Sequence, residues 1–290
     1  MKELARYGVV LFVFLSWAML LVYIFGCAKH EEKATQQDTA AHVALRDHYC
    51  ATITDDIYLA RCDKLTFKAL TAAYCPKDNF DLDDLEWDRD GKWYRDNMSC
   101  LADMNGDGQP DSKSECSGDG FIGLAHYWIS KGPDSLPQVN RTLEYLNSNN
   151  WICGEGDREI TNVRHLEPFL LSVQAYLSGG LEGLALLNSD GVVADHNKYL
   201  TALAVHATGR MQGEIDSSEK ALIAAWYAGD KESCVFTALY HRYHDGDQGE
   251  ALAAMEGFPS EVELRDGYGG WGSMPDATAQ VLCTGILEGV

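Results

Sequence analysis

Nineteen consecutive residues near the start of the chain, from Gly8 to Gly26 (GVVLFVFLSWAMLLVYIFG), carry no charge. At the helical rise of about 1.5 Å per residue, the run is long enough to cross the hydrocarbon core of a bilayer. An apolar segment of this length is not the surface helix of a soluble domain, so we expect it to lie in a membrane. The rest of the chain is then expected to fold beside that membrane, attached through its N-terminal end.

The apolar run ends at the tetrapeptide Ile24-Phe25-Gly26-Cys27, which resembles the lipobox of bacterial lipoproteins. This resemblance implies that Cys27 is acylated and becomes the mature N-terminus. An uncleaved signal anchor is the alternative, because the run exceeds the roughly 7 to 15 apolar residues of a cleaved signal. Residues 1–27 form the signal or anchor on either interpretation, and the small and polar residues 28–39 form a linker.

Nine cysteines indicate an oxidising compartment. If Cys27 carries lipid, eight cysteines remain, and this even number can form four disulfides. Zinc binding is disfavoured because the sequence has no Cys-x-x-Cys or His-x-x-x-His pair with chelating spacing. We therefore expect residues 40–290 to form one domain that faces the periplasm or the cell exterior.

The disulfide pairing is not determined by the sequence, since eight cysteines allow 105 connectivities. Spacing along the chain favours Cys100 with Cys116 as the first choice. The second choice pairs Cys50 with either Cys62 or Cys75.

The formal net charge of -21 disfavours one class of partner. Binding to phosphate backbones requires clustered Lys and Arg side chains that release counterions, so we expect no nucleic-acid partner. An acidic surface suits solubility, divalent cations or basic protein partners.

Short segments of helical periodicity recur throughout residues 40–290, and none of the chain shows the alternation of a half-buried strand. Consecutive short helices pack as antiparallel pairs, so we expect a mainly α fold, either an α/α toroid or a helical array. Residues 216–219 (DSSE) predict a capped helix start, and the apolar run 221–226 predicts a helix buried on more than one side. One or two helices are expected in 40–76, and others in 120–130, 138–147, 163–177, 196–211, 217–228, 232–243, 250–255 and 277–287.

Residues 77–120 differ from the rest because Asp and Glu crowd around Trp87 and Trp93. We expect an irregular acidic insert that stays outside the core. Within it, residues 103–111 (DMNGDGQPD) place oxygen-bearing side chains at positions 1, 3, 5 and 9 and a Gly at position 6. The alternative is a plain turn built from the same residue types.

This nine-residue motif resembles the calcium loops of EF-hands, dockerins and thrombospondin-type repeats. It departs from the EF-hand at position 12, where Ser114 replaces the bidentate Glu, so a solitary loop with a structural Ca²⁺ is the closer analogy. The ligands that the resemblance implies are Asp103, Asn105, Asp107, Asp111 and the carbonyl of Gln109.

Carboxylates and a histidine follow Trp151 and could form an acid/base site: Glu155, Asp157, Glu159 and His165. In α/α toroid hydrolases and lyases, such loop-to-helix junctions line the sugar cleft. The alternative is that these acids sit in the first turn of a helix and pair with a neighbouring Arg. Trp128, Trp151, Trp226 and Trp271 are aromatic side chains that suit sugars. His206, in an apolar stretch, is interpreted as a hydrogen-bonded core histidine.

Three functions follow from these patterns. The leading one is a membrane-tethered binding or structural protein of the cell envelope with a structural calcium site, and catalysis belongs to the first alternative. The first alternative is a glycan-processing hydrolase or lyase. The second is an adaptor, since residues 225–230 and 241–247 resemble the helix-turn-helix units of tetratricopeptide and Sel1-like repeats, with a groove over 196–255. The partner, whether protein or glycan, is left open.

Overall fold

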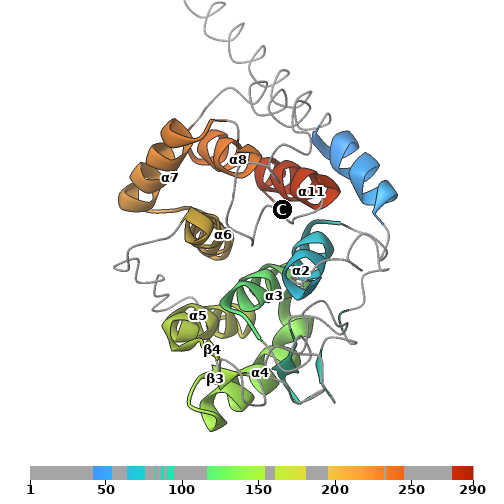
Figure 1. Cartoon of the computed structure of the whole chain (residues 1–290), viewed down its shortest axis with the longest axis vertical. Helices are drawn as coiled ribbons and strands as arrows, with labels where there is room; N and C mark the ends of the chain where they lie inside the picture. Colours follow the sequence, from blue (N-terminus) through green and yellow to red (C-terminus); the bar gives the residue numbers. More distant parts are fainter. Residues whose placement is uncertain are drawn as a thin grey trace, which may run out of the picture. The chain divides into compact units, whose positions relative to one another are not determined.

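The computed structural model describes residues 42–53, 64–75, 82, 86–87, 90–94, 116–153, 161–180, 195–231, 233–244 and 276–289. Most of these residues are helical, which confirms the mainly α prediction (Figure 1). The apolar run, the linker, the expected calcium loop and the expected helix 250–255 lie outside them. Among the helices of these ranges, none combines the length and the apolar character needed to cross a bilayer.

The expected helices reappear with small shifts at their ends. In the expected range 40–76, residues 42–52 are helical and precede α2. In the expected range 163–177, the 3-10 turn η5 comes first and α5 follows it. The helices are α2 (Lys64–Tyr74), α3 (Gly118–Lys131), η4 (Gly132–Ser135), α4 (Leu136–Ser148), η5 (Arg164–Leu166), α5 (Glu167–Leu177), α6 (Asp195–Gln212), α7 (Ser217–Gly229), α8 (Cys234–Tyr243) and α11 (Asp276–Glu288). Two short antiparallel strand pairs accompany them, β1 (Glu86–Trp87) with β2 (Lys92–Trp93) and β3 (Ile152–Cys153) with β4 (Thr161–Asn162).

Helix α3 lies at the centre of the described core. The Ser117 hydroxyl caps its first turn by accepting a hydrogen bond from the Gly120 amide, 3.2 Å away. The helix packs against α2, α5 and α6. Its approach to α2 depends on Gly123, where a Cβ would lie 2.8 Å from the Thr66 carbonyl oxygen. A larger residue at this position would therefore push the two helices apart.

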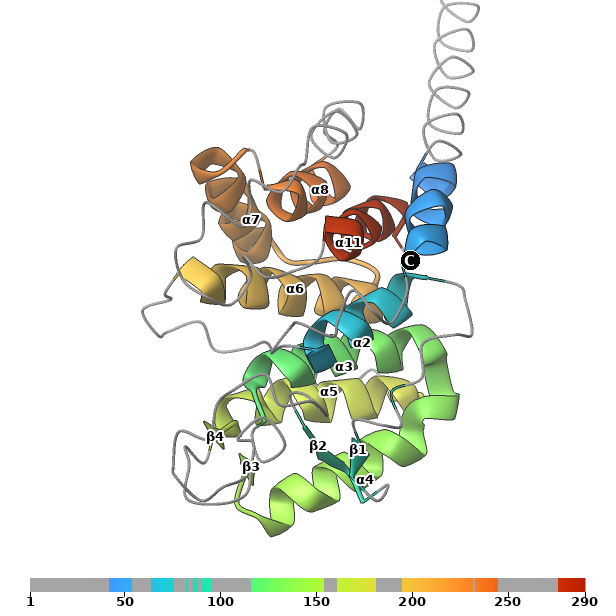
Figure 2. The same cartoon turned by 45° about the vertical axis from the view of Figure 1, so that its right-hand side comes forward.

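Helix α6 connects two groups of helices. It contacts α3 and α5 on one side and α7 and α8 on the other (Figure 2). Helix α11 in turn contacts both α2 and α8. The side chains that point inward from α2, α3, α6 and α8 therefore converge on one interior region.

Helix α7 begins as its sequence predicts. Oδ1 of Asp216 accepts hydrogen bonds from the amides of Ser218 and Glu219, at 2.8 and 2.9 Å. The Glu219 carboxylate accepts one in return from the Asp216 amide, at 2.7 Å. This reciprocal arrangement is the expected capping box.

The expectation that α7 is buried on more than one side is wrong. The side chains that it buries, Glu219, Ile223 and Tyr227, form one stripe at helical spacing. Ala221 and Ala225 are exposed. Alanine favours helix at any exposure, so the apolar run reflects helix propensity as much as burial.

The acidic insert also differs from expectation, because part of it belongs to the core. Leu82 and Trp93 are buried there. The Trp93 indole donates a hydrogen bond to Oγ1 of Thr142, 2.9 Å away, and its ring meets Trp128 edge to face at a centroid distance of 6.3 Å. The large apolar area of a tryptophan outweighs the acidic composition of its neighbours. The last residues of the insert also begin α3, at Gly118.

Among the described residues, three disulfides join segments that are distant in sequence. Cys50 bonds to Cys75 with a Cα separation of 5.7 Å, which confirms one of the two partners expected for Cys50. The bond between Cys116 and Cys153, with a Cα separation of 5.8 Å, shows that the expected Cys100–Cys116 pair is wrong. Closeness in sequence did not predict this pair, because β3 returns the chain to the start of α3 and brings Cys153 to Cys116. The third bond, Cys234–Cys283, has a Cα separation of 5.9 Å and joins α8 to α11.

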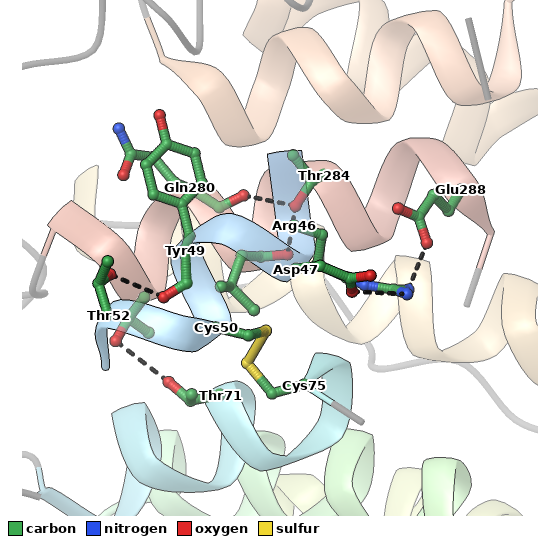
Figure 3. Close-up of a disulfide and its surroundings, with 12 residues drawn as sticks. Arg46, Asp47, Tyr49, Cys50, Thr52, Thr71, Cys75, Gln280, Thr284 and Glu288 are labelled. Carbon is green, nitrogen blue, oxygen red and sulfur yellow. Dashed lines mark hydrogen bonds and ion pairs between the residues drawn. A yellow bond between two sulfur atoms is a disulfide. The ribbon is translucent and has the colours of Figure 1, made fainter. Parts of the chain in front are cut away.

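The helical residues 42–52 are attached to the core by more than one bond (Figure 3). Cys50 links them covalently to the end of α2. Arg46 forms an ion pair with Glu288, at the end of α11, and also lies 3.5 Å from an oxygen of Asp47. This first segment of the domain is therefore fixed to two helices, one early and one late in the chain.

Candidate functional site

Most of the residues that the sequence nominates for chemistry lie outside the described ranges. This holds for three of the four acid/base candidates, for the calcium loop and for the lipidation site. Within the described residues, no group of three or more His, Cys, Asp or Glu side chains could hold a metal ion. The residues outside are Glu155, Asp157, Glu159, Asp103, Asn105, Asp107, Gln109, Asp111 and Cys27.

His165 is the acid/base candidate that the structure places. It lies in η5 and is exposed, and so is its neighbour Arg164. Nε of Arg164 lies 3.6 Å from a carboxylate oxygen of Glu167, one turn later. Such a pairing was the alternative to catalysis, and at this exposure it contributes about 0–1 kcal/mol.

The tryptophans nominated for sugar contacts are largely internal. Trp128 donates its indole N–H to Gln138 at 2.7 Å, and Trp151 donates to Asn147 at 3.0 Å. Both rings are almost fully buried. Trp226 is partly buried and stacks on Phe236 at a centroid distance of 5.8 Å. Trp271 lies outside the described residues.

A polar cluster that the sequence did not reveal as a unit occupies the interior between four helices. It contains Tyr74 from α2, His126 from α3, His206 and Arg210 from α6, and Tyr243 from α8. We call these five residues the tyrosine–histidine cluster. Tyr74 and both histidines are almost fully buried, whereas Arg210 and Tyr243 are partly buried.

One half of the cluster is a chain of two hydrogen bonds. Nε2 of His126 lies 2.9 Å from the Leu203 carbonyl oxygen, so this nitrogen carries the proton and donates. In the neutral ring Nδ1 is then an acceptor, and it lies 2.8 Å from the Tyr74 hydroxyl, which donates. The chain therefore connects α2, α3 and α6.

The other half centres on His206. Nδ1 of this ring lies 2.9 Å from the Tyr243 hydroxyl, so α6 and α8 are joined in the same way. This confirms the interpretation of His206 as a hydrogen-bonded core histidine. Its Nε2 atom, however, is buried without a hydrogen-bond partner.

The two halves are in direct contact. The imidazole rings of His126 and His206 stack with their centroids 5.9 Å apart. The Tyr74 ring stacks on His206 at 6.4 Å, and the Arg210 guanidinium lies 5.3 Å from the Tyr74 ring centroid. A cationic group over an aromatic face is a favourable arrangement.

Two glycines let the tyrosines enter the cluster. A Cβ at Gly209 would collide with the Tyr243 hydroxyl, and one at Gly285, on α11, would collide with the Tyr74 ring. These positions have no spare volume, so the packing around the cluster is tight.

Burial controls the charges of the cluster. The pKa of His126 is lowered to about 3, mainly by burial and secondly by the positive charge of Arg210, against a hydrogen bond to Leu203 that raises it. Burial likewise holds the pKa of His206 well below its ordinary value, with smaller contributions from His126, Arg210 and Arg242. Both histidines are therefore neutral at pH 7.

The tyrosines stay protonated for the same reason. Burial raises the pKa of Tyr74 to about 12, although the charge of Arg210 acts in the opposite direction. Burial also raises the pKa of Tyr243 above its ordinary value, against the charges of Arg242 and Arg210. Within the cluster, Arg210 is thus the charged group at neutral pH.

The arrangement is poorly suited to proton transfer at neutral pH. A general base works best when its pKa is near the operating pH, and the pKa values of these two histidines lie far below pH 7. The tyrosines are equally far from forming a nucleophilic phenolate. The cluster is instead suited to holding helices in register and to presenting hydrogen-bond donors in a dry environment.

The sequence contains a signal for this cluster that is visible once the fold is known. His126 interrupts the apolar stretch FIGLAHYWI, and His206 interrupts ALAVHA. A histidine at a core position of a helix needs a polar partner, and two such helices can place their polar groups together. The sequence does not say which helices are neighbours, so the partners could not be named.

Comparisons of the chain with protein-family models, with curated proteins and with solved structures found no match.

Proposed function

We propose that this chain is a membrane-tethered, extracytoplasmic helical protein that binds a partner in, or structurally supports, the cell envelope. The observation that carries the proposal is the presence of three buried disulfides, which join segments 25, 37 and 49 residues apart. Disulfides of this kind persist in oxidising compartments and are rare in the cytosol. The apolar run 8–26 provides the route out of the cytosol and the attachment.

The way in which the first segment of the domain is fixed to the core also supports a tether. Residues 43–52 follow the linker and are held by the Cys50–Cys75 bond and the Arg46–Glu288 ion pair. A tethered domain transmits any pull through its first segment, and a covalent bond to the core keeps that segment from unravelling. Lipid on Cys27, or the uncleaved apolar run, anchors the other end.

The fold is proposed to be a set of antiparallel helical pairs, as an α/α toroid or a helical array. The successive contacts of α7 with α8 and of α8 with α11 support such pairing. A structural Ca²⁺ bound by Asp103, Asn105, Asp107, Gln109 and Asp111 orders the insert. The segment 95–115 starts after buried Tyr94 and ends at disulfide-bonded Cys116, so a cation there would close a loop with fixed ends.

The tyrosine–histidine cluster supports a structural role, because its hydrogen bonds join α2, α3, α6 and α8 in the interior. Its histidines have pKa values too low, and its tyrosines pKa values too high, for acid/base work near pH 7. The exposed position of His165 adds no support for the glycan-processing alternative.

The test is the intact mass of the protein purified from membranes, together with protease treatment of spheroplasts. We expect an acylated N-terminal Cys27, or an intact N-terminus for an uncleaved anchor, and digestion of the domain from the outside. Each result identifies one form of the tether. A domain that resists protease until the inner membrane is opened, with cysteines that react with a thiol reagent before reduction, would refute the proposal.

A further inference from the structure

The charge of Arg210 lacks a counterion where the structure describes its surroundings. Its guanidinium is partly buried, and Nη1 is buried without a hydrogen-bond partner. Among the described residues, no carboxylate forms an ion pair with it. An uncompensated charge away from water is costly, and proteins usually pair such a group or provide it with a ligand.

A second polar atom without a partner belongs to the same cluster. His206 is fully buried, and its Nε2 atom makes no hydrogen bond. When the Tyr243 hydroxyl donates to Nδ1, the ring proton of neutral His206 resides on Nε2. That nitrogen is then a hydrogen-bond donor that lacks an acceptor.

The two donors are close neighbours. His206 and Arg210 are four residues apart on α6, so their side chains leave the same face of the helix. The ring of Tyr74 lies beside both, 6.4 Å from the His206 centroid and 5.3 Å from the Arg210 guanidinium. Both donors therefore belong to one face of α6, next to the Tyr74 ring.

We propose that Arg210 and His206 bind one small monovalent anion, of the size of chloride or formate, through Nη1–H and Nε2–H. The anion supplies the charge that Arg210 lacks and an acceptor for both donors. The anion has to be small, because the side chains of Tyr243 and Tyr74 already fill the space beside Gly209 and Gly285. The acidic chain, with a net charge of -21, opposes anions in general, so binding depends on the local positive charge of Arg210.

The test uses the full chain in detergent at pH 7.5 and constant ionic strength. Sodium gluconate, whose anion is too large for the site, is replaced stepwise by sodium chloride or sodium formate, and thermal unfolding is followed by near-UV circular dichroism. We expect Tm to rise and then saturate, by about 4 °C at ten times the dissociation constant. A rise with chloride alone identifies a monatomic site, and a rise with formate alone identifies an oxyanion site. No saturable rise with either anion overturns the proposal.

Matched variants separate binding from a general salt effect. Arg210→Met keeps the alkyl stem and removes the donor, and it is expected to abolish the saturable rise. Arg164→Met removes an exposed arginine from η5, away from the cluster, and is expected to retain the rise. A rise in Arg210→Met equal to that of the parent protein overturns the proposal.

Imidazole NMR of the unmodified protein gives a readout that needs no variant. We expect a His206 ring proton on Nε2 whose resonance moves saturably with the same dissociation constant as Tm. A His206 tautomer protonated on Nδ1 would leave Nε2 as an acceptor, which Arg210 could satisfy directly, and would overturn the proposal. None of these outcomes depends on the tether, so the proposed function is tested separately.

Discussion

The hydroxyl of Tyr74, at the last position of α2, lies 2.8 Å from Nδ1 of His126 in α3, and both side chains are almost fully buried. Because Nε2 of His126 also donates to the Leu203 carbonyl, the two hydrogen bonds of this ring connect three helices. Buried hydrogen bonds are most valuable when every member has a partner. Loss of the Tyr74 hydroxyl should therefore destabilise the fold.

We expect Tyr74→Phe to lower the free energy of unfolding by about 1–3 kcal/mol. The substitution keeps the ring but leaves Nδ1 of His126 buried without a donor, and an unsatisfied buried acceptor has a cost of this size. Urea unfolding followed by tryptophan fluorescence measures the change. Tyr176→Phe, at a half-buried position in α5, is the control and is expected to change stability by less than about 0.5 kcal/mol. Equal effects of the two substitutions would contradict the role of the contact.

We expect stability to fall as the pH drops below about 6.5. The folded protein disfavours protonation of His126 and His206, whose pKa values are lowered, whereas the unfolded chain protonates its histidines normally. The unfolded state then binds more protons, and each buried histidine removes up to about 1.4 kcal/mol per pH unit. This loss continues towards pH 3, where His126 itself titrates in the fold.

The measurement for this prediction is the free energy of unfolding between pH 4 and pH 8. His126→Gln, which retains an acceptor for Tyr74, is expected to flatten the slope between pH 5 and pH 6.5 even if it lowers stability overall. His165→Gln, at an exposed position, is expected to leave the slope unchanged. A slope that is insensitive to both substitutions would rule out the buried histidines as its source.

We expect the mass of the unfolded, unreduced protein to rise by eight hydrogens on reduction. The three disulfides that the structure describes account for six of these. Cys62 and Cys100 are the remaining pair once Cys27 is set aside for lipid, and their disulfide supplies the other two. Tryptic mapping without reductant should recover a peptide that contains both residues. Alkylation of these two cysteines before reduction would contradict the fourth disulfide.

The double substitution Cys234→Ser with Cys283→Ser is expected to lower the free energy of unfolding by about 2–5 kcal/mol. This disulfide joins α8 to α11 across 49 residues and lies in the interior. Denaturant unfolding of the variant and of the parent protein, each fully oxidised, measures the difference. Equal midpoints would mean that noncovalent packing alone holds these helices.

We expect Ca²⁺ to protect the segment 95–115 from proteolysis. A cation held by the proposed oxygen ligands orders a segment whose ends are attached at Tyr94 and Cys116. Limited proteolysis with and without a chelator, analysed by mass spectrometry, locates the cuts. Asp107→Asn should abolish the protection, whereas Asp134→Asn, at an exposed position in η4, should not. If the cuts are the same with and without the chelator, residues 103–111 form a plain turn and do not bind Ca²⁺.

The positions of the helices could be predicted from the sequence because they depend on local chemistry. The Asp216–Glu219 capping box is an interaction between residues three apart, and its residue types name both partners. The helix expected over 163–177 does end at Leu177, just before Gly179 and Gly180, because glycine disfavours helix. Burial was less predictable, since Ala221 is apolar yet exposed and Trp93 is buried amid acidic neighbours.

What the sequence by itself determined is therefore the helical class, the cap of α7 and the number of cysteines available for pairing. The tertiary structure decided which of these distant groups meet. Cys116 meets Cys153 because the chain returns through β3, although Cys100 is closer in sequence. His126 and His206 stack because α6 packs on α3. The physical reason is that hydrogen bonds within a helix are local, whereas the packing that excludes water joins residues of any separation.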